Sequence, residues 1–295
     1  MSIDRSELAI RRKVLVVPTV SCVNRVVEMV ERIRPDVAVL THQHGCGMFD
    51  HDVAGLSTML AATAGHPHVA ATVLVSLGCE SNQPEFMLAR MGRAVPTAVV
   101  RFQDHAGHDD VVAEVIRQLD ELTPRAVPLA GDLRSLKVGV LVEDGSSIAR
   151  SGVPGGLVAE LARRGAVVHG PNLYALGRGR SVSNSLPEMA TATLGQASVG
   201  SDAQEVSALV ASGCHLVVVL GDRPGPLGSP VAPVLTAATD PSWTAIADVV
   251  VSVVDTSGAV ESLLRAVDGV VAGALTLGEQ ARVRTLSVRR VSMTM

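Results

Sequence analysis

Short apolar runs alternate with amphipathic segments along most of the chain, and this alternation limits the available folds more than any other feature. Runs at residues 14–18, 37–40 and 69–77 have the length of buried strands and are rich in β-branched side chains. The segment 111–122 repeats its apolar residues at helical spacing instead. Strands and helices in alternation predict a mostly parallel sheet built from right-handed crossovers.

The alternation is interrupted once, in a stretch that contains Pro124, Pro128 and Gly131. Such a stretch without a periodic segment is typical of a linker between domains. A second passage of strands and helices follows it, so we place the domains at residues 1–128 and 129–295. We expect an α/β protein with two Rossmann-like domains, mostly parallel sheets and helices on both faces. A stretch rich in Gly and Ser, residues 177–200, predicts a long loop in the second domain.

Composition excludes several function classes. Aromatic residues make up 2% of the chain and the formal net charge is −4, which argues against a nucleic-acid partner. The apolar runs are shorter than the roughly 20 residues that a membrane span needs, and no signal peptide is recognisable. The four cysteines do not form a dense disulfide framework. We expect a cytoplasmic protein with reduced thiols and no association with membranes.

Three of the four cysteines follow predicted strands. Cys22, Cys46 and Cys79 each come shortly after a strand, and parallel packing would bring them to the carboxyl edge of one sheet, where ligands bind. A cysteine taken alone is more often a core residue than a ligand, so Cys22 and Cys214 are expected to be buried. The histidines at 51, 66, 68, 105 and 108 are expected to be solvated.

The segment that contains Cys46 adds imidazoles to this edge. If residues 41–46 continue extended, His42, His44 and Cys46 point to one side, because strand side chains alternate. Imidazole and thiolate together suit Fe(II), Zn(II) or Co(II), and Glu80 beside Cys79 adds an oxygen ligand. A catalytic metal keeps an open position, so about three of these groups would bind it while the others act as acid or base.

A loop in the second domain is a candidate anion site. Ser146, Ser151 and Gly152 follow a predicted strand and precede a helix, and a helix N-terminus with nearby hydroxyls can hold a carboxylate. An ordinary turn with capping serines explains the same residues equally well. The glycine spacing fits neither a dinucleotide fingerprint nor a P-loop, so no nucleotide is expected.

Segments 17–22, 41–48, 66–67 and 77–83 resemble, in order and spacing, the motifs of the altronate/galactarate dehydratase family, most densely over residues 13–92. The resemblance implies a carbon-oxygen lyase that removes water, or in a related branch sulfite, from a sugar acid or related 2-hydroxy carboxylate. It also implies a divalent metal, Fe2+ first, with Zn2+ or Mn2+ as alternatives.

The resemblance carries His42, Cys46, Cys79 and Glu80 over as the metal and catalytic region without separating their roles. Our working assignment takes His42, Cys46 and Cys79 as metal ligands and His44 and Glu80 as catalytic residues. The substrate-binding residues that it implies are Asn82, Gln83, Ser146, Ser151 and Gly152.

The second half departs from the family pattern, since Ser147 stands where the family has an aspartate. A non-catalytic binding or scaffold subunit, and a metal-dependent hydrolase or sulfo-lyase on the same scaffold, therefore stay open. Family enzymes often carry a small β-rich domain before the strand that here begins at Lys13, and only residues 1–12 precede it. We expect a separate small subunit as a partner, and a homo-oligomer.

Overall fold

The computed structural model describes residues 9–122, 136–170, 182–183, 202–284 and 286–288. Its first sheet has the strand order β2-β1-β3-β4, and every pairing in it is parallel. Its strands are β1 (Lys13–Pro18), β2 (Ala38–Val39), β3 (Val69–Ser76) and β4 (Thr97–Arg101).

The second sheet has the order β10-β9-β8-β5-β6-β7 and is also parallel throughout. Its strands are β5 (Lys137–Val142), β6 (Val167–His169), β7 (Val182–Ser183), β8 (Leu216–Gly221), β9 (Val234–Ala238) and β10 (Val249–Val250). The predicted pair of parallel α/β sheets is confirmed. The predicted boundary at residue 128 lies outside the described residues.

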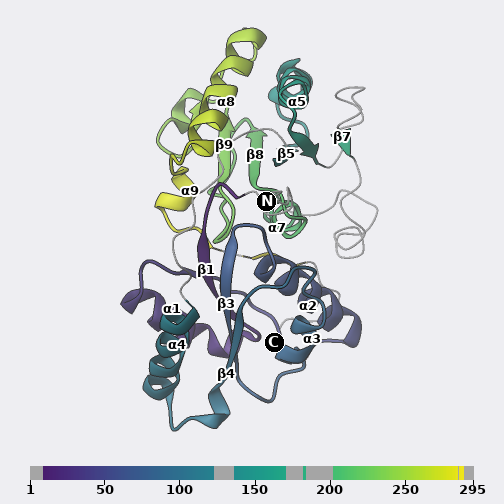
Figure 1. Cartoon of the computed structure of the whole chain (residues 1–295). Coiled ribbons are helices and arrows are strands. Elements are labelled where there is room, and N and C mark those ends of the chain that lie inside the picture. The colour runs from purple at the N-terminus through teal and green to yellow at the C-terminus, as the bar shows by residue number, and fades with distance from the viewer. Residues whose placement is uncertain (1–8, 123–135, 171–181, 184–201, 285, 289–295) are drawn as a thin grey trace, which may run out of the picture.

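Helices cover both faces of each sheet, as predicted (Figure 1). Valine side chains of α1 and α4 form one core with the first sheet, while α2 and α3 pack on its other face. On the second sheet, α5 and α8 share one core and α7 covers the opposite face. The helices are α1 (Asn24–Ile33), α2 (Asp50–Ala64), α3 (Pro84–Leu88), α4 (His108–Leu122), α5 (Val153–Arg163), α7 (Asp202–Ala211), α8 (Thr256–Val271) and the short α9 (Leu277–Gln280).

The bounds of two strands in the second sheet have a local physical cause. β9 begins at Val234 because Pro233 has no N–H and joins the sheet only through its carbonyl, which accepts from Val217. β10 has two residues, and the chain beyond it leads to Asp255, whose side chain caps α8.

The two domains meet at the amino ends of their strands. His66, just before β3, hydrogen-bonds the carbonyl of Cys214, just before β8, at 3.0 Å. A shared core of α2 and α7 side chains extends this contact. Because the amino edges face each other, the carboxyl edges of the two sheets point in opposite directions, with the first domain below and the second above in Figure 1.

Candidate functional site at the carboxyl edge of the first sheet

The loops that follow β1, β2 and β3 are joined by their backbones. The N–H of Ser21 donates to the carbonyl of His44 at 2.8 Å, and the N–H of Ser81 donates to the carbonyl of Gly45 at 3.2 Å. Gly45 has a φ of +110°, and a Cβ there would lie 2.7 Å from the carbonyl oxygen of Thr19. Only glycine fits such a close crossing, so the His/Cys segment is fixed against its neighbours.

His42 is buried, and both of its ring nitrogens are engaged. Nε2 lies 2.8 Å from the carbonyl oxygen of Pro18, and because a carbonyl only accepts, Nε2 carries the proton. Nδ1 accepts the backbone N–H of His44 at 3.2 Å. Burial lowers the pKa of His42 to about 4, against the opposing effect of the Pro18 hydrogen bond. In this arrangement His42 is neutral and offers no lone pair to a metal.

His44 is half-buried and stacks on His42, with ring centroids 6.0 Å apart and planes 15° from parallel. Its backbone position is fixed by the hydrogen bond to His42 and by the bond from Ser21. A neutral imidazole therefore supports a second, more accessible imidazole at the edge of the sheet. His44 is the better placed of the two to exchange a proton with a ligand.

Glu80 is an internal anchor of the edge. Its Oε1 accepts from Thr19 Oγ1 at 2.5 Å and from Ser76 Oγ at 2.6 Å, while Oε2 accepts from the N–H of Gly78 at 2.7 Å. Burial would raise the pKa of this carboxyl, but the hydroxyl and backbone hydrogen bonds outweigh burial and lower it. The carboxylate, 3% exposed, is thus held ionised and joins β1 to β3.

Cys22, Cys46 and Cys79 are all exposed, whereas Cys214 is buried. The core position expected for Cys22 is wrong, and the one expected for Cys214 is confirmed. Within the described residues, no three His, Cys, Asp or Glu side chains are grouped so as to hold a metal ion. Of the predicted ligands, only Cys46 and Cys79 present accessible donor atoms on neighbouring loops.

Two side-chain amides at this edge have buried oxygen atoms without a partner among the described residues. Asn82 donates from Nδ2 to the carbonyl of Thr19, and Asn24 donates to the carbonyl of His42, yet the Oδ1 atom of each is unsatisfied. A buried acceptor of this kind calls for a water, ion or ligand. Gln83 instead uses its amide within the turn, donating to the carbonyl of Glu80 at 2.6 Å.

Residues 4–127 match the family model "D-galactarate dehydratase/Altronate hydrolase, second domain". This part of the chain is therefore similar to the second domain of that family. Altronate dehydratase of Escherichia coli (strain K12) is 27% identical over 162 residues, which cover 50% of this chain and 32% of that protein. Altronate dehydratase of Bacillus subtilis (strain 168) is 33% identical over 102 residues, covering 31% and 20%. The chain thus spans about a third or less of the length of these relatives.

Two solved structures are similar to the chain at low scores. The glycosyl transferase family 9 protein from Veillonella parvula DSM 2008 has a TM-score of 0.31 and 10% identity, covering 92% of this chain and 100% of that one. The glycosyltransferase SnogD from Streptomyces nogalater has a TM-score of 0.21 and 15% identity, covering 92% and 97%.

The second-domain residues predicted to bind substrate are engaged in local turns. Ser146 Oγ donates to the carbonyl of Glu143 at 2.6 Å, and Ser151 Oγ donates to the carbonyl of Ile148 at 2.7 Å. Each hydroxyl also accepts a backbone N–H of the turn that follows. Gly152 is the N-cap of α5. The two serine hydroxyls thus form the hydrogen bonds of ordinary turns, and the anion site at this loop stays a prediction.

A carboxylate that the sequence analysis did not single out lies at the carboxyl edge of the second sheet. Asp222, directly after β8, accepts from Ser147 Oγ at 2.5 Å and from Thr239 Oγ1 at 2.6 Å. These hydrogen bonds lower the pKa of Asp222 to about 2. An aspartate therefore bonds directly to Ser147, the residue at which the sequence was expected to depart from the family pattern. The only sequence signal was its position immediately after a buried strand.

The two groups of predicted site residues are not brought together. Because the amino edges of the sheets meet, the loops with His44 and Cys79 and the loop with Ser151 lie at opposite ends of the described structure. No helix within the described ranges has the length and apolarity to cross a membrane.

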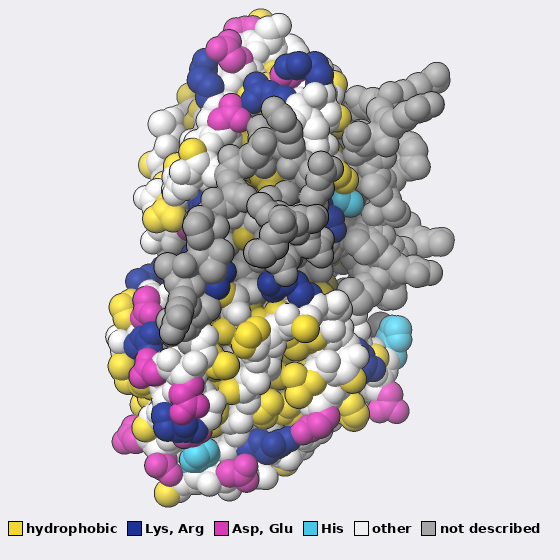
Figure 2. Space-filling model, in the orientation of Figure 1, with side chains coloured by type: hydrophobic (Ala, Val, Ile, Leu, Met, Phe, Trp, Pro, Cys, Tyr) yellow, Lys and Arg dark blue, Asp and Glu magenta, His cyan; other side chains and the backbone are white. Residues whose placement is uncertain are grey.

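Large apolar side chains are exposed beside the His/Cys edge. Phe49, just before α2, is 67% exposed, and Phe86 of α3 is 47% exposed. Figure 2 shows hydrophobic side chains gathered on one face of the first domain. Exposed apolar surface next to a polar site is typical of contact with another chain.

Proposed function

We propose that the carboxyl edge of the first sheet is the active site of a metal-assisted lyase that removes water from a sugar acid or related 2-hydroxy carboxylate. The observation that carries this proposal is that backbone hydrogen bonds join the loops that contain His44, Cys46 and Cys79 at one edge, in a region that matches the dehydratase family model. The two relatives are both named altronate dehydratase, which supports a dehydration reaction. The substrate of this chain has to be found by experiment.

The proposed metal is divalent, Fe2+ first, with Zn2+ or Mn2+ as alternatives. Cys46 and Cys79 fit Fe2+ or Zn2+ because their thiols are exposed on adjacent loops and thiolates bind these two ions, whereas Mn2+ favours oxygen ligands. His42 does not fit, since both of its nitrogens are occupied. When bound, the metal would supply Lewis acidity toward the substrate's carboxylate and hydroxyl groups.

The remaining steps, proton transfer and positioning, would fall to residues of the chain itself. His44 would take the proton α to the carboxylate, the β carbon–oxygen bond would break, and the hydroxyl would leave as water after protonation. The resulting enol would become the 2-keto acid. His42 would position His44, and Glu80 would hold the β1 and β3 loops at the correct separation. Asn82 would offer its unsatisfied Oδ1 once a ligand or water enters.

We also propose that the apolar surface at Phe49 and Phe86 contacts another chain, either a second copy or a small subunit. Its position directly beside the His/Cys edge supports a partner that would complete the site.

The test is an assay for 2-keto acid formation on a panel of altronate, galactarate and sulfolactate, using anaerobically purified protein of known metal content. We expect activity on a sugar acid, and a fall of at least 100-fold in kcat for His44→Gln. His51→Gln, an exposed histidine on α2, is the matched control and should keep full activity. Metal-free protein, or equal activity of the two variants, would overturn the assignment.

A second candidate is a non-catalytic binding or scaffold subunit. It is favoured by the occupied nitrogens of His42 and by the lack of a preformed three-ligand group in the described part of the chain. Stoichiometric metal that is lost in Cys46→Ser, without turnover of any panel member, would support this candidate. Turnover of sulfolactate alone would point to a sulfo-lyase instead.

A further inference from the structure

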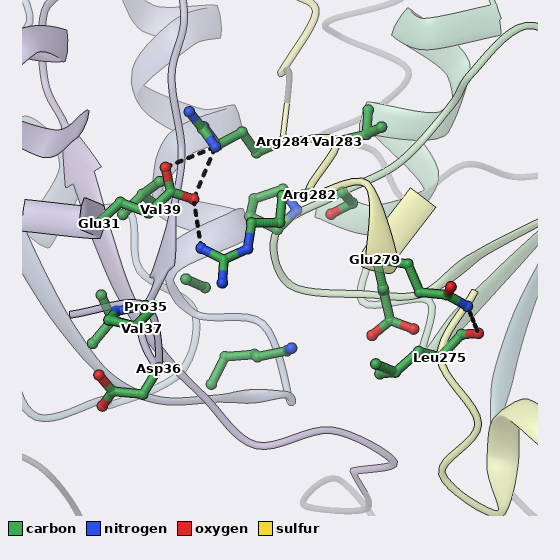
Figure 3. Close-up of a pocket in the computed structure, with 15 residues that line it drawn as sticks. Glu31, Pro35, Asp36, Val37, Val39, Leu275, Glu279, Arg282, Val283 and Arg284 are labelled. Carbon is green, nitrogen blue, oxygen red and sulfur yellow. Dashed lines mark hydrogen bonds and ion pairs between the residues drawn. The ribbon is translucent and has the colours of Figure 1, made fainter. Parts of the chain in front are cut away.

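A polar cleft of about 340 Å³ lies where the two domains meet, beside the edge strand β2 and at the opposite end of the first sheet from the His/Cys edge (Figure 3). The first domain contributes Lys13 at the start of β1 and Glu31 of α1. The second contributes Glu279 of α9 and the segment 282–284 that follows it. The cleft is therefore built from both domains.

Two of the acids that line this cleft are already paired. Glu279 binds Arg11 through both carboxylate oxygens, at 2.8 and 2.9 Å, and both side chains are less than a tenth exposed. Asp36 is paired with Arg34 at 2.8 Å, and Arg34 also binds Asp120 at 2.5 Å. The carboxylate of Glu279 is therefore held by Arg11 and that of Asp36 by Arg34.

The third acid, Glu31, is shared between two arginines. Arg284 lies 2.7 Å from one of its oxygens and 2.8 Å from the other, while Arg282 approaches only to 3.8 Å (Figure 3). One carboxylate thus faces two guanidinium groups. The arginine side of the cleft has an excess of positive charge.

Lys13 adds to this excess. Among the described residues no carboxylate forms an ion pair with its amine, and the acid that acts on it, Glu279, is held by Arg11. Burial lowers the pKa of Lys13, and the attraction of Glu279 does not compensate. An amine in this situation is stabilised by an added anion. Lys13 is one of only two lysines in the chain.

The backbone at Arg282 has a conformation that usually favours glycine. Helix α9 ends with the N–H of Arg282 bonded to the carbonyl of Glu279 and the N–H of Val283 bonded to that of Gly278. This Schellman arrangement needs a left-handed residue at position 282, where glycine is the usual choice. Arginine adopts it here with a φ of +53°. Such strain is typical of a residue whose side chain is needed.

We propose that this cleft binds a small dianion, a phosphate or a dicarboxylate, between Lys13, Arg282 and Arg284. The planar guanidinium groups match the paired oxygens of either anion, and the amine adds a point charge. The N–H of Val39, which lines the cleft, also points away from β1, because the neighbouring N–H of Leu40 donates to Val16 in β1. A bound dianion would connect the two domains.

The test is isothermal titration of the full chain with inorganic phosphate and, separately, with succinate, in a buffer without either class of anion. We expect one saturable site per chain for at least one probe, weakened at least tenfold in Arg282→Gly. Glycine suits the left-handed position, so this variant should fold at least as well as the parent. Arg265→Ala, an exposed arginine on α8, is the matched control and should bind normally.

Glu31→Gln should have the opposite effect on anion binding. It removes the carboxylate that faces both arginines, so we expect the affinity for the anion to rise three- to tenfold. His44→Gln should leave the titration unchanged, which separates this cleft from the proposed active site. The proposal is overturned if neither probe saturates, or if Arg282→Gly binds as tightly as the parent chain.

Discussion

The first sheet carries a His-x-His segment at each end, and the first histidine of both is held in the same way. His42 donates from Nε2 to the carbonyl of Pro18 at 2.8 Å, and His66 donates to that of Cys214 at 3.0 Å. In each case Nδ1 accepts the N–H of the residue two positions later, at 3.2 and 3.1 Å. At both ends of the sheet, the first histidine therefore has a structural role, because both of its ring nitrogens are hydrogen-bonded to the backbone.

The second histidines differ. His68 is 1% exposed, its Nδ1 donates to the carbonyl of Val231 at 3.0 Å, and its Nε2 accepts the N–H of Ile10. His44 is only half-buried, at an edge with exposed thiols. The same motif therefore joins two domains at the amino edge and presents an accessible imidazole at the carboxyl edge. The surroundings of the second histidine decide which role the motif serves.

The largest expected effect is on stability at the amino edge. His66→Ala would leave the carbonyl of Cys214 and the N–H of His68 without partners and open a cavity between the domains. We expect the free energy of unfolding to fall by about 3–5 kcal/mol. His44→Ala should cost less than about 1 kcal/mol, because its side chain is half-exposed. Urea unfolding of both variants measures the difference, and similar losses would contradict the comparison.

The second-largest expected effect is a loss of stability at low pH, caused by the buried histidines. Burial lowers the pKa of His66 to about 3, and His215, Arg93 and Lys137 act in the same direction. The unfolded chain takes up a proton near pH 6.5 whereas folded His66 does not, so stability is lost as pH falls below about 6.5. At pH 5 this one histidine costs about 2 kcal/mol.

His42, with a pKa lowered to about 4, should add a similar loss over the same range. The measurement is the free energy of unfolding between pH 7.5 and 5, and His66→Gln should show a shallower slope than the parent chain. If the substitution leaves the slope of unfolding free energy against pH unchanged, His66 is not held neutral in the folded chain.

The sequence was sufficient to predict the strands, their parallel arrangement and the meeting of residues 19–22, 42–46 and 77–83, because these depend on local periodicity and strand order. It was not sufficient to separate His42 from His44. The Pro18 carbonyl that engages His42 comes from a different strand, and the partner of His66 is 148 residues away. The solvated positions expected for His66 and His68 were wrong for the same reason.

The relative direction of the two sheets could not be predicted from the sequence either. Apolar patterning predicts that α2 and α7 bury a face, but it does not show that they bury it against each other. That contact sets the amino edges together. Ser146, Ser151 and Gly152 consequently lie far from the residues with which the family resemblance had grouped them.

A moderate effect is expected at the anchor of the carboxyl edge. Glu80→Gln replaces one acceptor oxygen by an NH2 group, which cannot accept from Thr19, Ser76 or Gly78. We expect a loss of about 1–3 kcal/mol in the free energy of unfolding, since one donor becomes unsatisfied. Glu85→Gln, an exposed glutamate on α3, is the control. An unchanged stability would show that Glu80 is free for another role.

The smallest effect is expected at the carboxyl edge of the second sheet. Ser151→Ala removes the hydroxyl that bonds Ile148 and Val153, so the turn before α5 should lose about 1 kcal/mol or less. Because this edge points away from His44, we expect no change in 2-keto acid formation and none in metal content. A loss of activity without a loss of stability would instead place the second-domain loop at the active site, for example across an interface between copies of the chain.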